Sequence, residues 1–553
     1  MASSRRRVQV LNATSDVLPA VGLEGLRSPH HTGYINVDYT NDGDIFYWHF
    51  DADPDDASES SATLPLVIWL QGGPGCSSLI GLFLECGPFR MHDDGSVAPN
   101  PHGWHKAANV LFVDQPVGTG MSRVQHDAYP TSGDQVAAHF YLFLVEFLKQ
   151  HPQYLRGDST RPIFLFGESH AGRWIPQFHT YIARQNAKQS PSSFHIHIEG
   201  VGIGNGWIHP HVQYDYSAFA HGLGLISHAQ RRSLELDCQA AIDAGNMNTP
   251  ECFRNLDSIV ASVQGGTSRL NVFDVRLYGD AALYPAQKPL LTTFLNRPDV
   301  RTAMASVEKS QLAKGTPHEF AECNAYVNRN LAGEDAVSTL ADVNAMLANG
   351  VRVLLYNGQW DMMCNALNTE LLVEQLTWVG RTTYVGARRF TWRLGSGRVP
   401  AGFVQSGGNL TSIVVRDAGH LVPYDAPEAA LDMVKRFIHS RSFEDIEQQV
   451  ANQDDGPSQR CQSRQSDDGS SSHVMMVVAV ASGVVAALLT WLLMRPQVVA
   501  VKRTHDEECG GEDNSSSSDD DDDGVEEDLM QGHVELTRKE TAASRTRKTI
   551  DIA

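Results

Sequence analysis

Short apolar runs alternate with longer amphipathic stretches over most of the first 440 residues. Each short run ends at a glycine or a polar turn, as strands do, and residues 133–150 carry apolar side chains at helical spacing. Strands that alternate with helices indicate an α/β fold with a parallel sheet. The predicted strands are residues 66–70, 110–113, 163–166, 198–204, 351–356 and 412–415.

The alternation is lost between about residues 209 and 340, where helical patches, turn residues and three cysteines follow one another. An insertion between two strands of the sheet is the simplest account. We therefore expect a core in two parts, residues 30–208 and 341–445, interrupted by an insertion at 209–340.

A second apolar pattern follows the core. Residues 474–494 carry no charge and are long enough to cross a bilayer. A polar linker (446–473) precedes them, and an acidic, serine-rich tail of disordered character (495–553) follows. Basic residues directly after the apolar segment predict a single-pass type I protein with a luminal catalytic part. A buried core helix is the alternative, but it would stand isolated between two polar segments.

The charge balance limits the function classes. Formal net charge is −21, and the tail alone holds 8 basic and 16 acidic residues. No basic face for nucleic acid is expected. The eight cysteines form no C-x-x-C pair, which argues against a cytosolic metal site. We expect no metal and no cofactor.

The first 29 residues are ambiguous. Basic residues 5–7 are not followed by the apolar run of a signal peptide. Asn12 and Asn409 nevertheless stand in glycosylation sequons. We therefore expect an incomplete or unusual N-terminal segment rather than a cytosolic protein.

The strand predicted at 163–166 runs into Gly167-Glu168-Ser169-His170-Ala171-Gly172. A strand, a tight turn of small residues around a serine and a following helix are typical of a nucleophile elbow. Taken alone, a plain structural turn explains these residues equally well.

A glycine-rich loop, Gln71-Gly72-Gly73-Pro74-Gly75, follows the strand predicted at 66–70. In α/β-hydrolases such a loop gives one oxyanion amide, and the residue after the nucleophile gives the other. Gly73 and His170 are the candidates here. The alternative is an ordinary glycine-rich turn.

Two further polar residues stand just past predicted strands. Asp361 follows the strand at 351–356, and His420 follows the strand at 412–415. The chain order Ser169, Asp361, His420 matches the triad order of α/β-hydrolases. Serine needs such a base to become a nucleophile, and the aspartate orients the imidazole.

Three motifs, at 72–78 (Gly-Gly-Pro-Gly-Cys-Ser-Ser), 114–120 (Asp-Gln-Pro-Val-Gly-Thr-Gly) and 167–169 (Gly-Glu-Ser), resemble those of the serine carboxypeptidase family. The resemblance extends over about residues 30–440. It implies an α/β-hydrolase fold whose inserted region caps the active site, and peptide hydrolysis through an acyl-enzyme.

The resemblance also assigns recognition of the substrate's free α-carboxylate to Gln71, Glu85 and Glu168. Like charges in one site raise a carboxyl pKa, so one glutamate would stay protonated and donate a hydrogen bond. Peptidase activity should then be highest at acid pH. Without the resemblance, Glu85 would be interpreted as a solvated surface acid.

Gln71, His170, Gln359 and Leu421 stand where the family usually has Asn, Tyr, Asp and Met. The Gln71 side chain is longer than Asn and is therefore expected to affect carboxylate binding. His170 would act through its backbone amide, so the change from Tyr leaves the triad intact. Candidates for the pockets that hold substrate side chains (S1 and S1′) are Met363, Cys364 and Leu421.

The resemblance pairs Cys76 with Cys323 and makes Cys364 a free thiol of the active site. A local disulfide between Cys238 and Cys252 is also expected. The pairing of Cys86 and Cys461 stays open.

A serine carboxypeptidase followed by one membrane helix and an acidic tail resembles the membrane-anchored, pheromone-processing carboxypeptidase D branch of the fungal late Golgi. This implies removal of C-terminal Lys and Arg from propeptides in the trans-Golgi network. The expected partners are peptide or propeptide C-termini, the membrane, and sorting adaptors on the cytosolic tail.

Two other functions remain open. An acyltransferase or esterase would use the same triad with another acceptor. A catalytically impaired luminal binding protein would explain the departures from the family pattern. The turnover of a blocked dipeptide would distinguish the carboxypeptidase from these two alternatives.

Overall fold

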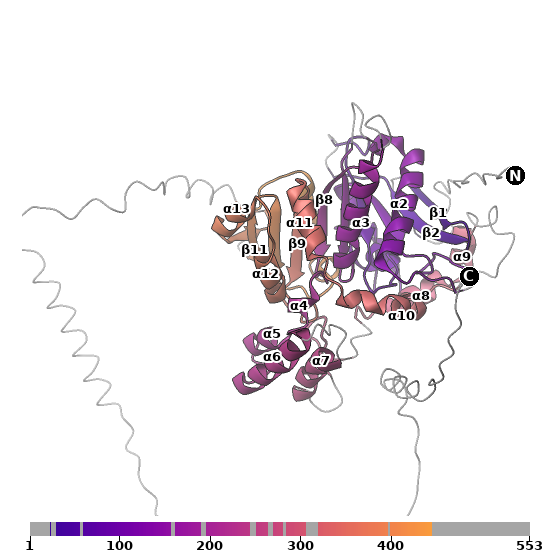
Figure 1. Ribbon diagram of the computed structural model, residues 1–553. Coiled ribbons are helices and arrows are strands. Elements are labelled where there is room, and N and C mark those ends of the chain that lie inside the picture. The colour runs from indigo at the N-terminus through magenta and orange to yellow at the C-terminus, as the bar shows by residue number, and fades with distance from the viewer. Residues whose placement is uncertain are drawn as a thin grey trace, which may run out of the picture. The chain divides into compact units, whose positions relative to one another are not determined.

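The computed structural model describes Leu23 and residues 29–444, with gaps at 56–58, 126, 156–160, 190–194, 244–249, 264–268, 280–283, 306–318 and 396–398. The chain divides into two units, residues 1–458 and 459–553. All described residues belong to the first unit (Figure 1).

A ten-stranded sheet forms the centre of this unit, in the order β1-β2-β6-β3-β7-β8-β9-β12-β11-β10. The strands from β6 to β12 are parallel, and the outer strands pair antiparallel. The strands are β1 (His30–Asp38), β2 (Gly43–Phe50), β3 (Leu66–Leu70), β6 (Asn109–Asp114), β7 (Ile163–Glu168), β8 (Ile198–Gly204), β9 (Arg352–Gly358), β10 (Phe390–Arg393), β11 (Pro400–Gly407) and β12 (Leu410–Val415).

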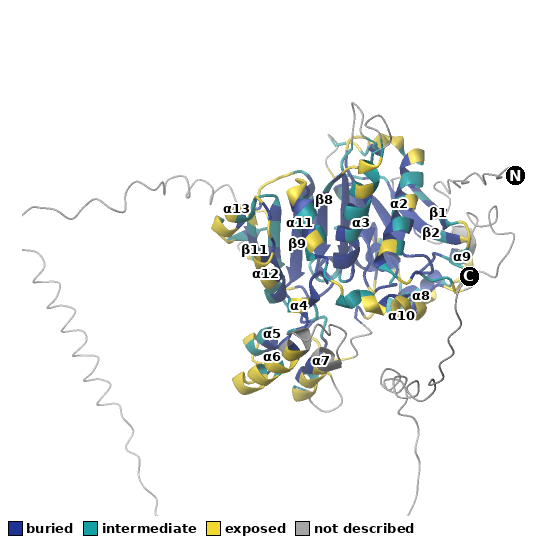
Figure 2. Cartoon of the chain, in the orientation of Figure 1, coloured by how far each residue is buried: buried dark blue, intermediate teal, exposed yellow. Residues whose placement is uncertain are grey.

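Helices cover both faces of the sheet, which explains why its central strands are buried at every position and are mostly apolar. On one face, Leu165 of β7 packs in a core with α2 (Gly133–Gln150), α3 (Ala171–Ala187) and α11 (Leu340–Ala348). On the other, Phe166 packs in a core with α15 (Pro427–Ile438). The strands are dark blue between these helices in Figure 2. The α/β fold with a largely parallel sheet is as predicted.

The segment between β8 and β9 is mostly helical. Helices α5 and α7 share a small core, to which Met362 of the loop after β9 also belongs. Helix α6 is exposed along most of its length (Figure 2). The helices of this segment are α4 (Pro210–Gln213), α5 (Ser217–Gly222), α6 (His228–Asp243), α7 (Pro250–Ser262), α8 (Lys288–Leu295), α9 (Pro298–Ala305), α10 (Ala325–Leu331) and α11, with the 3₁₀ turn η5 (Ala332–Ala336) before α11.

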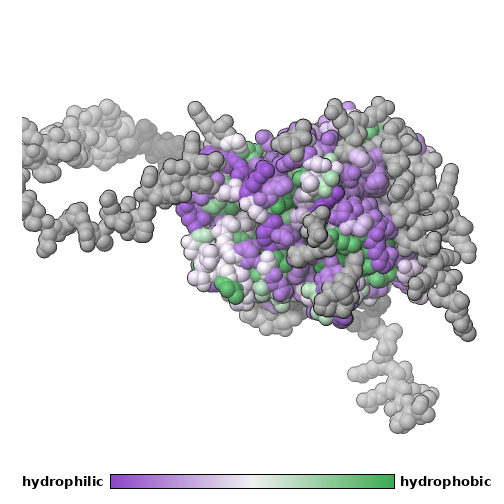
Figure 3. Space-filling model, turned by 90° about the horizontal axis from the view of Figure 1, so that it is seen from above, coloured by the Kyte–Doolittle hydropathy of each residue, from purple (hydrophilic) through white to green (hydrophobic). Residues whose placement is uncertain are grey.

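Shorter elements complete the unit. They are the π-helix η1 (Gly81–Glu85), the 3₁₀ turns η2 (Trp104–Lys106) and η3 (Pro152–Tyr154), the pair β4 (Phe89–Met91) and β5 (Val97–Pro99), and helices α12 (Ala366–Glu374), α13 (Arg381–Gly386) and α14 (Val422–Asp425). On the face seen in Figure 3, apolar residues (green) lie scattered among polar ones (purple). Such scattered residues are normal for a protein surface.

Among the described residues, no helix combines the length and the apolar character needed to cross a bilayer. The predicted membrane segment 474–494, the linker 446–473, the tail 495–553 and the sequon at Asn12 all lie outside the described residues.

Candidate active site

Ser169 and His170 form the turn between β7 and α3. Ser169 has a φ of 58°, a left-handed conformation that few residues other than glycine adopt. The Ser169 N–H donates to the carbonyl of Gly204 at 2.9 Å, and the Ser169 carbonyl accepts from Gly172 at 2.9 Å and Trp207 at 2.8 Å. Ser169 is half-buried while Glu168 and His170 are buried. The turn therefore presents the serine at the carboxyl edge of the sheet, as predicted for a nucleophile elbow.

The glycine-rich loop after β3 lies directly against this turn. A β-carbon on Gly72 would lie 2.7 Å from Ser169 Cβ and 2.8 Å from His170 N, so only glycine fits there. Gly73 has a φ of 114°, which also favours glycine. Within the described part of the chain, the N–H groups of Gly73 and His170 have no acceptor. Both amides predicted for an oxyanion hole are thus available beside Ser169.

Asp114 at the end of β6 holds this loop in place. The carboxylate accepts from Ser77 Oγ at 2.7 Å, from the Ser78 amide at 2.8 Å and from the Met121 amide at 2.8 Å. A disulfide between Cys76 and Cys323 ties the same loop to the segment before α10. Asp114 belongs to the sequence motif at 114–120, but only these contacts in the structure show that it anchors the glycine-rich loop.

The Asp361 and His420 side chains meet at the ends of β9 and β12, which are neighbours in the sheet. His420 Nδ1 lies 2.8 Å from Asp361 Oδ2, and both residues are buried. The His420 amide donates to the carbonyl of Phe273 at 2.7 Å, and the two rings are 4.9 Å apart. The insertion therefore contacts the histidine directly, and Nδ1 is the nitrogen that faces the aspartate.

Asn205, just after β8, is a further residue of the candidate site. Its Nδ2 donates to Asp361 Oδ2 at 2.6 Å, while its Oδ1 accepts from the Gly358 amide at 3.0 Å. Asn205 thus orients the aspartate that orients His420. The sequence places Asn205 after a strand, but only the folded chain brings it to Asp361.

Asp361, Cys364 and His420 offer ligand atoms within 4.8 Å of one another, so a metal site is the alternative use of these residues. Both Asp361 oxygens already accept hydrogen bonds, from the Met363 amide at 2.9 Å on one and from Asn205, Cys364 and His420 on the other. Burial, together with the Asp361 charge, raises the pKa of the Cys364 thiol well above its ordinary value. A neutral thiol is a poor ligand, so the three residues fit an oriented histidine better than a metal.

Gln71, Glu85 and Glu168 come together in one buried cluster, as the family resemblance implies. Gln71 Nε2 donates to Glu168 Oε1 at 2.6 Å and lies 3.4 Å from Glu85 Oε1. Trp69 Nε1 donates to Gln71 Oε1 at 2.8 Å, which fixes the direction of the amide. The second carboxyl oxygen, Oε2, of each glutamate is buried without a partner among the described residues. We call Gln71, Glu85 and Glu168 the carboxyl cluster.

The carboxyl cluster holds protons at neutral pH. Burial raises the pKa of Glu85 to about 7. Burial and the negative charge of Glu85 raise the pKa of Glu168 well above its ordinary value. Below about pH 7 the pair therefore keeps at least one proton, which can be donated to an anion.

The remaining candidate residues of the substrate pockets, Met363, Cys364 and Leu421, neighbour Asp361 and His420 in the chain. The Met363 sulfur is 3.7 Å from the Tyr216 hydroxyl, and Leu421 is buried directly before α14. Cys364 is a buried free thiol, as expected, and Cys86 is also free. Cys238 is disulfide-bonded. The side chain of Cys252, its predicted partner, is outside the described set.

Asn409 stands at the turn between β11 and β12 with a φ of 60°. Its Nδ2 donates to the carbonyls of Leu347 at 3.2 Å and Val351 at 2.7 Å. A glycan attached to Nδ2 would replace one of its two hydrogens, so only one of these two hydrogen bonds could remain. Both hydrogens of this nitrogen are thus engaged in the folded protein, and glycosylation of Asn409 stays a prediction.

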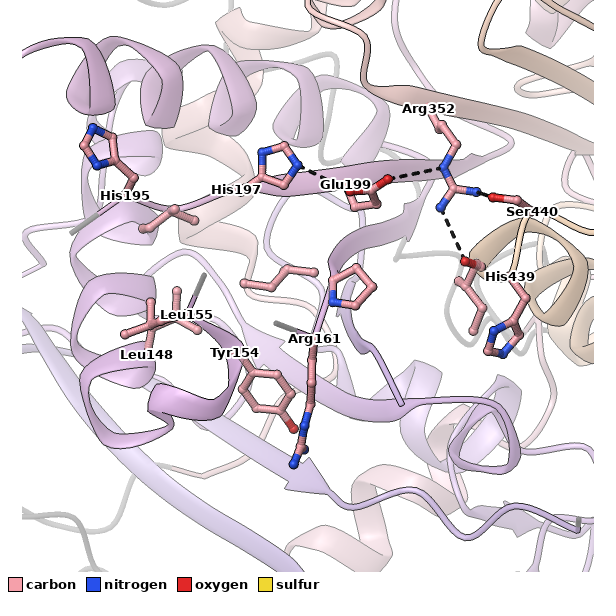
Figure 4. Close-up of a pocket in the computed structure, with 14 residues that line it drawn as sticks. Leu148, Tyr154, Leu155, Arg161, His195, His197, Glu199, Arg352, His439 and Ser440 are labelled. Carbon is pink, nitrogen blue, oxygen red and sulfur yellow. Dashed lines mark hydrogen bonds and ion pairs between the residues drawn. The ribbon is translucent and has the colours of Figure 1, made fainter. Parts of the chain in front are cut away.

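A hollow of about 340 Å³ lies at the amino ends of β7, β8 and β9, the edge opposite the catalytic residues (Figure 4). Arg352 lines it, but its guanidinium donates to the carbonyl of Phe437 at 2.6 Å and to Ser440 Oγ at 2.7 Å. This arginine ties the end of α15 to the sheet. The hollow is separate from Ser169 and His420.

Comparison with known proteins places the chain in a family. The serine carboxypeptidase family profile matches residues 19–440. The pheromone-processing carboxypeptidase Kex1 of Phytophthora infestans is 44% identical over 433 residues, which cover 76% of this chain and 70% of that protein. The serine carboxypeptidase S10 family member 2 of Dictyostelium discoideum is 36% identical over 440 residues, which cover 76% of this chain and 75% of that protein.

A solved structure agrees with the sequence comparisons. The crystal structure of Kex1, a prohormone-processing carboxypeptidase from Saccharomyces cerevisiae, matches with a TM-score of 0.66 at 26% identity. The match covers 76% of this chain and 92% of that chain, and supports the α/β-hydrolase type of fold. Because the family profile spans nearly all of the described residues, the chain belongs to the serine carboxypeptidase family and is a serine-type carboxypeptidase.

Proposed function

We propose that this carboxypeptidase uses Ser169 as nucleophile and His420 as general base. Ser169 Oγ attacks the carbonyl carbon of the last peptide bond while His420 takes the hydroxyl proton. The proton then passes to the leaving amine, the C–N bond breaks, and an acyl-enzyme forms. Water, deprotonated by the same histidine, releases the shortened peptide.

Two sets of groups assist these steps. Asp361, held by Asn205, keeps the His420 Nδ1–H directed at its carboxylate and stabilises the imidazolium. The Gly73 and His170 amides bind the oxyanion of the tetrahedral intermediate, which is supported by their lack of other acceptors among the described residues.

The proposed exopeptidase activity depends on the carboxyl cluster. A protonated glutamate and the Gln71 amide donate hydrogen bonds to the free α-carboxylate of the leaving residue. The observation that supports this is a buried pair of glutamates with raised pKa values, each with an unpartnered oxygen among the described residues. Two ionised glutamates would instead repel a carboxylate.

Propeptides that end in Lys or Arg are the proposed substrates, and the trans-Golgi network is the proposed location. The names of the similar proteins, pheromone-processing and prohormone-processing carboxypeptidases, support the first. The apolar segment 474–494, followed by basic residues, supports a single-pass anchor with the catalytic unit in the lumen. Adaptors that bind the acidic tail would sort the protein.

A matched pair of substrates tests the role of the carboxyl cluster. For a blocked dipeptide ending in Arg, kcat/KM should peak below pH 7, because raising pH removes the donor proton and adds repulsion. The corresponding Arg-amide has no carboxylate, and His420 must be neutral, so its kcat/KM should peak at higher pH. Above pH 7 the acid should lose about tenfold per unit relative to the amide.

Glu168→Gln should bring the two pH profiles together, because a neutral amide donates at any pH. Glu199→Gln, a half-exposed acid of β8, is the control and should change neither profile. Identical wild-type profiles for acid and amide would refute carboxylate binding by the cluster. A blocked dipeptide ending in Leu, run alongside, measures the preference for Arg.

Removal of the chain from Val474 onward tests the anchor. Expressed behind a working signal sequence, the truncated protein should be secreted, soluble and as active as the full chain, because the catalytic motifs end before the linker. The full chain should sediment with membranes and require detergent for release. An inactive or insoluble truncation would mean that the segment belongs to the catalytic fold.

A further inference from the structure

The side chain of His170 and the carboxyl cluster lie on opposite faces of the sheet. The His170 ring packs on Trp174, 4.5 Å away, which belongs to the core shared with α2 and α3. The cluster instead binds Trp69, which belongs to the core on the other face. Ser169 therefore stands between the carboxyl cluster and the His170 side chain.

Asp335 of η5 meets His170 on its face of the sheet. His170 Nε2 lies 2.9 Å from Asp335 Oδ1, and the aspartate side chain is 32% exposed. Trp207 Nε1 donates to the Asp335 carbonyl at 2.8 Å. Arg173 of α3 binds the Glu334 carboxylate and the Val337 carbonyl on either side. These contacts fix η5 against the start of α3 and hold the Asp335 carboxylate beside the residue that follows the nucleophile.

The charge on Asp335 is not balanced by an arginine or lysine among the described residues. The nearby Arg173 is paired with Glu334, and the ionisable side chain that Asp335 contacts within the described part of the chain is His170. The Asp335 charge acts on neighbouring groups. After burial it raises the pKa of the Tyr214 hydroxyl, and after burial and the Asp361 charge it raises the pKa of the Cys364 thiol. A half-exposed carboxylate thus gives one side of the site a negative potential.

We propose that Asp335, which lies beside His170, binds the cationic side chain of the acyl-side residue, the substrate residue that contributes the carbonyl of the scissile bond. The proposal rests on the proposed function, because the carboxyl cluster defines where the leaving residue lies. With the leaving residue's carboxylate held on one face, the acyl-side residue extends from Ser169 toward the other. There a Lys or Arg side chain meets a carboxylate, whereas an acidic side chain is repelled.

No arginine or lysine among the described residues balances the Asp335 carboxylate, and a substrate cation would neutralise its charge. Because Asp335 is partly exposed, we expect a selectivity of about tenfold, the size of a single ion pair that is only partly desolvated.

Blocked dipeptides that end in Arg and carry Lys, Leu or Glu as the acyl-side residue test the proposal with the full chain. Wild-type kcat/KM should fall in the order Lys, Leu, Glu. Asp335→Asn should reduce the ratio of kcat/KM for Lys over Leu by about tenfold, and Asp335→Lys should make Glu the preferred residue. Glu199→Gln removes a half-exposed charge at the opposite edge of the sheet, and should leave the ratio unchanged. Thermal melting verifies that each variant folds. If a variant at position 335 does not fold, Asp335→Ser is measured in its place.

Esters of blocked Lys, Leu and Glu separate this proposal from the proposed function, because they keep the acyl-side residue and lack the C-terminal carboxylate. If esters are cleaved but peptide acids are not, the exopeptidase proposal fails, and the same Lys-to-Leu ratio still measures the role of Asp335. A wild-type ratio near one, or a ratio that Asp335→Asn leaves unchanged, overturns the proposal while the carboxypeptidase assignment stands.

Discussion

Ser169→Ala is expected to lower kcat on a blocked dipeptide by about 10⁵–10⁶-fold, a larger effect than that of any other single substitution proposed for this protein. In the proposed mechanism this hydroxyl forms the acyl-enzyme, and the other residue of the turn, His170, carries no hydroxyl. Peptidase and esterase activity should fall together, because both pass through the same intermediate. The measurement is kcat by release of the C-terminal residue and by ester cleavage.

The fold should survive this change. Backbone hydrogen bonds to Gly204, Gly172 and Trp207 hold the turn, and alanine keeps all of them. The melting temperature of Ser169→Ala should therefore match the wild type, and Ser406→Ala, an exposed serine of β11, serves as the active control. Turnover by the Ser169 variant comparable to wild type, after contaminating protease has been removed, would refute the mechanism.

Asp361→Asn is expected to lower kcat by about 10⁴-fold, because it reverses the polarity at His420 Nδ1. The aspartate accepts a hydrogen from Nδ1, whereas an asparagine NH₂ in that place would donate and favour the tautomer that cannot serve as base. The carboxylate also accepts on both oxygens, from Met363 on one and from Asn205 and Cys364 on the other. Either orientation of the amide therefore directs its NH₂ at a donor.

A loss of stability accompanies this loss of activity. A buried donor left without an acceptor costs about 1–3 kcal/mol, so the melting temperature of Asp361→Asn should drop while the protein still folds. Asp417→Asn, an exposed aspartate of the same loop as His420, controls for the change of charge and should be neutral. If Asp361→Asn retains more than about a tenth of wild-type kcat, the aspartate does not orient the base.

The sequence determined the parallel strands of the sheet and the chain order of the proposed catalytic residues, whereas the antiparallel edge strands β1, β2, β10 and β11 were not predicted. Parallel strands covered on both faces must be apolar at every position, so runs such as 163–166 are recognisable without any partner. Because parallel strands share a carboxyl edge, residues just after three of them meet there. Ser169, Asp361 and His420 could therefore be assigned from chain order, and the structure brings the aspartate and histidine together.

The ends of the strands were predicted less well. The last predicted strand begins at residue 412, whereas β12 begins at Leu410 and pairs there with Val353. The strand predicted at 110–113 extends to Asn109 and Asp114 in β6. The cause is that a strand continues for as long as its neighbours supply hydrogen bonds, and polar residues at its ends carry no apolar signal.

The burial of Glu85 and its raised pKa could not be predicted from the sequence alone. Composition favours a solvated acid at this position, and only the family resemblance suggested otherwise. In the structure Glu85 is fully buried at the end of η1, and burial raises its pKa to about 7. Desolvation depends on every element packed around a group, so no local pattern encodes it.

The sequence by itself thus determined which residues are able to perform the chemistry, because those residues stand at fixed positions relative to strands and turns. The tertiary structure alone decided their supporting contacts: Asn205 on Asp361, Asp114 on the oxyanion loop, and Asp335 beside His170. These partners lie 156, 36 and 165 positions apart in the chain. Hydrogen bonds and ion pairs act over a few ångströms in space, and such distances between remote residues exist only once the sheet, the insertion and the loops have packed together.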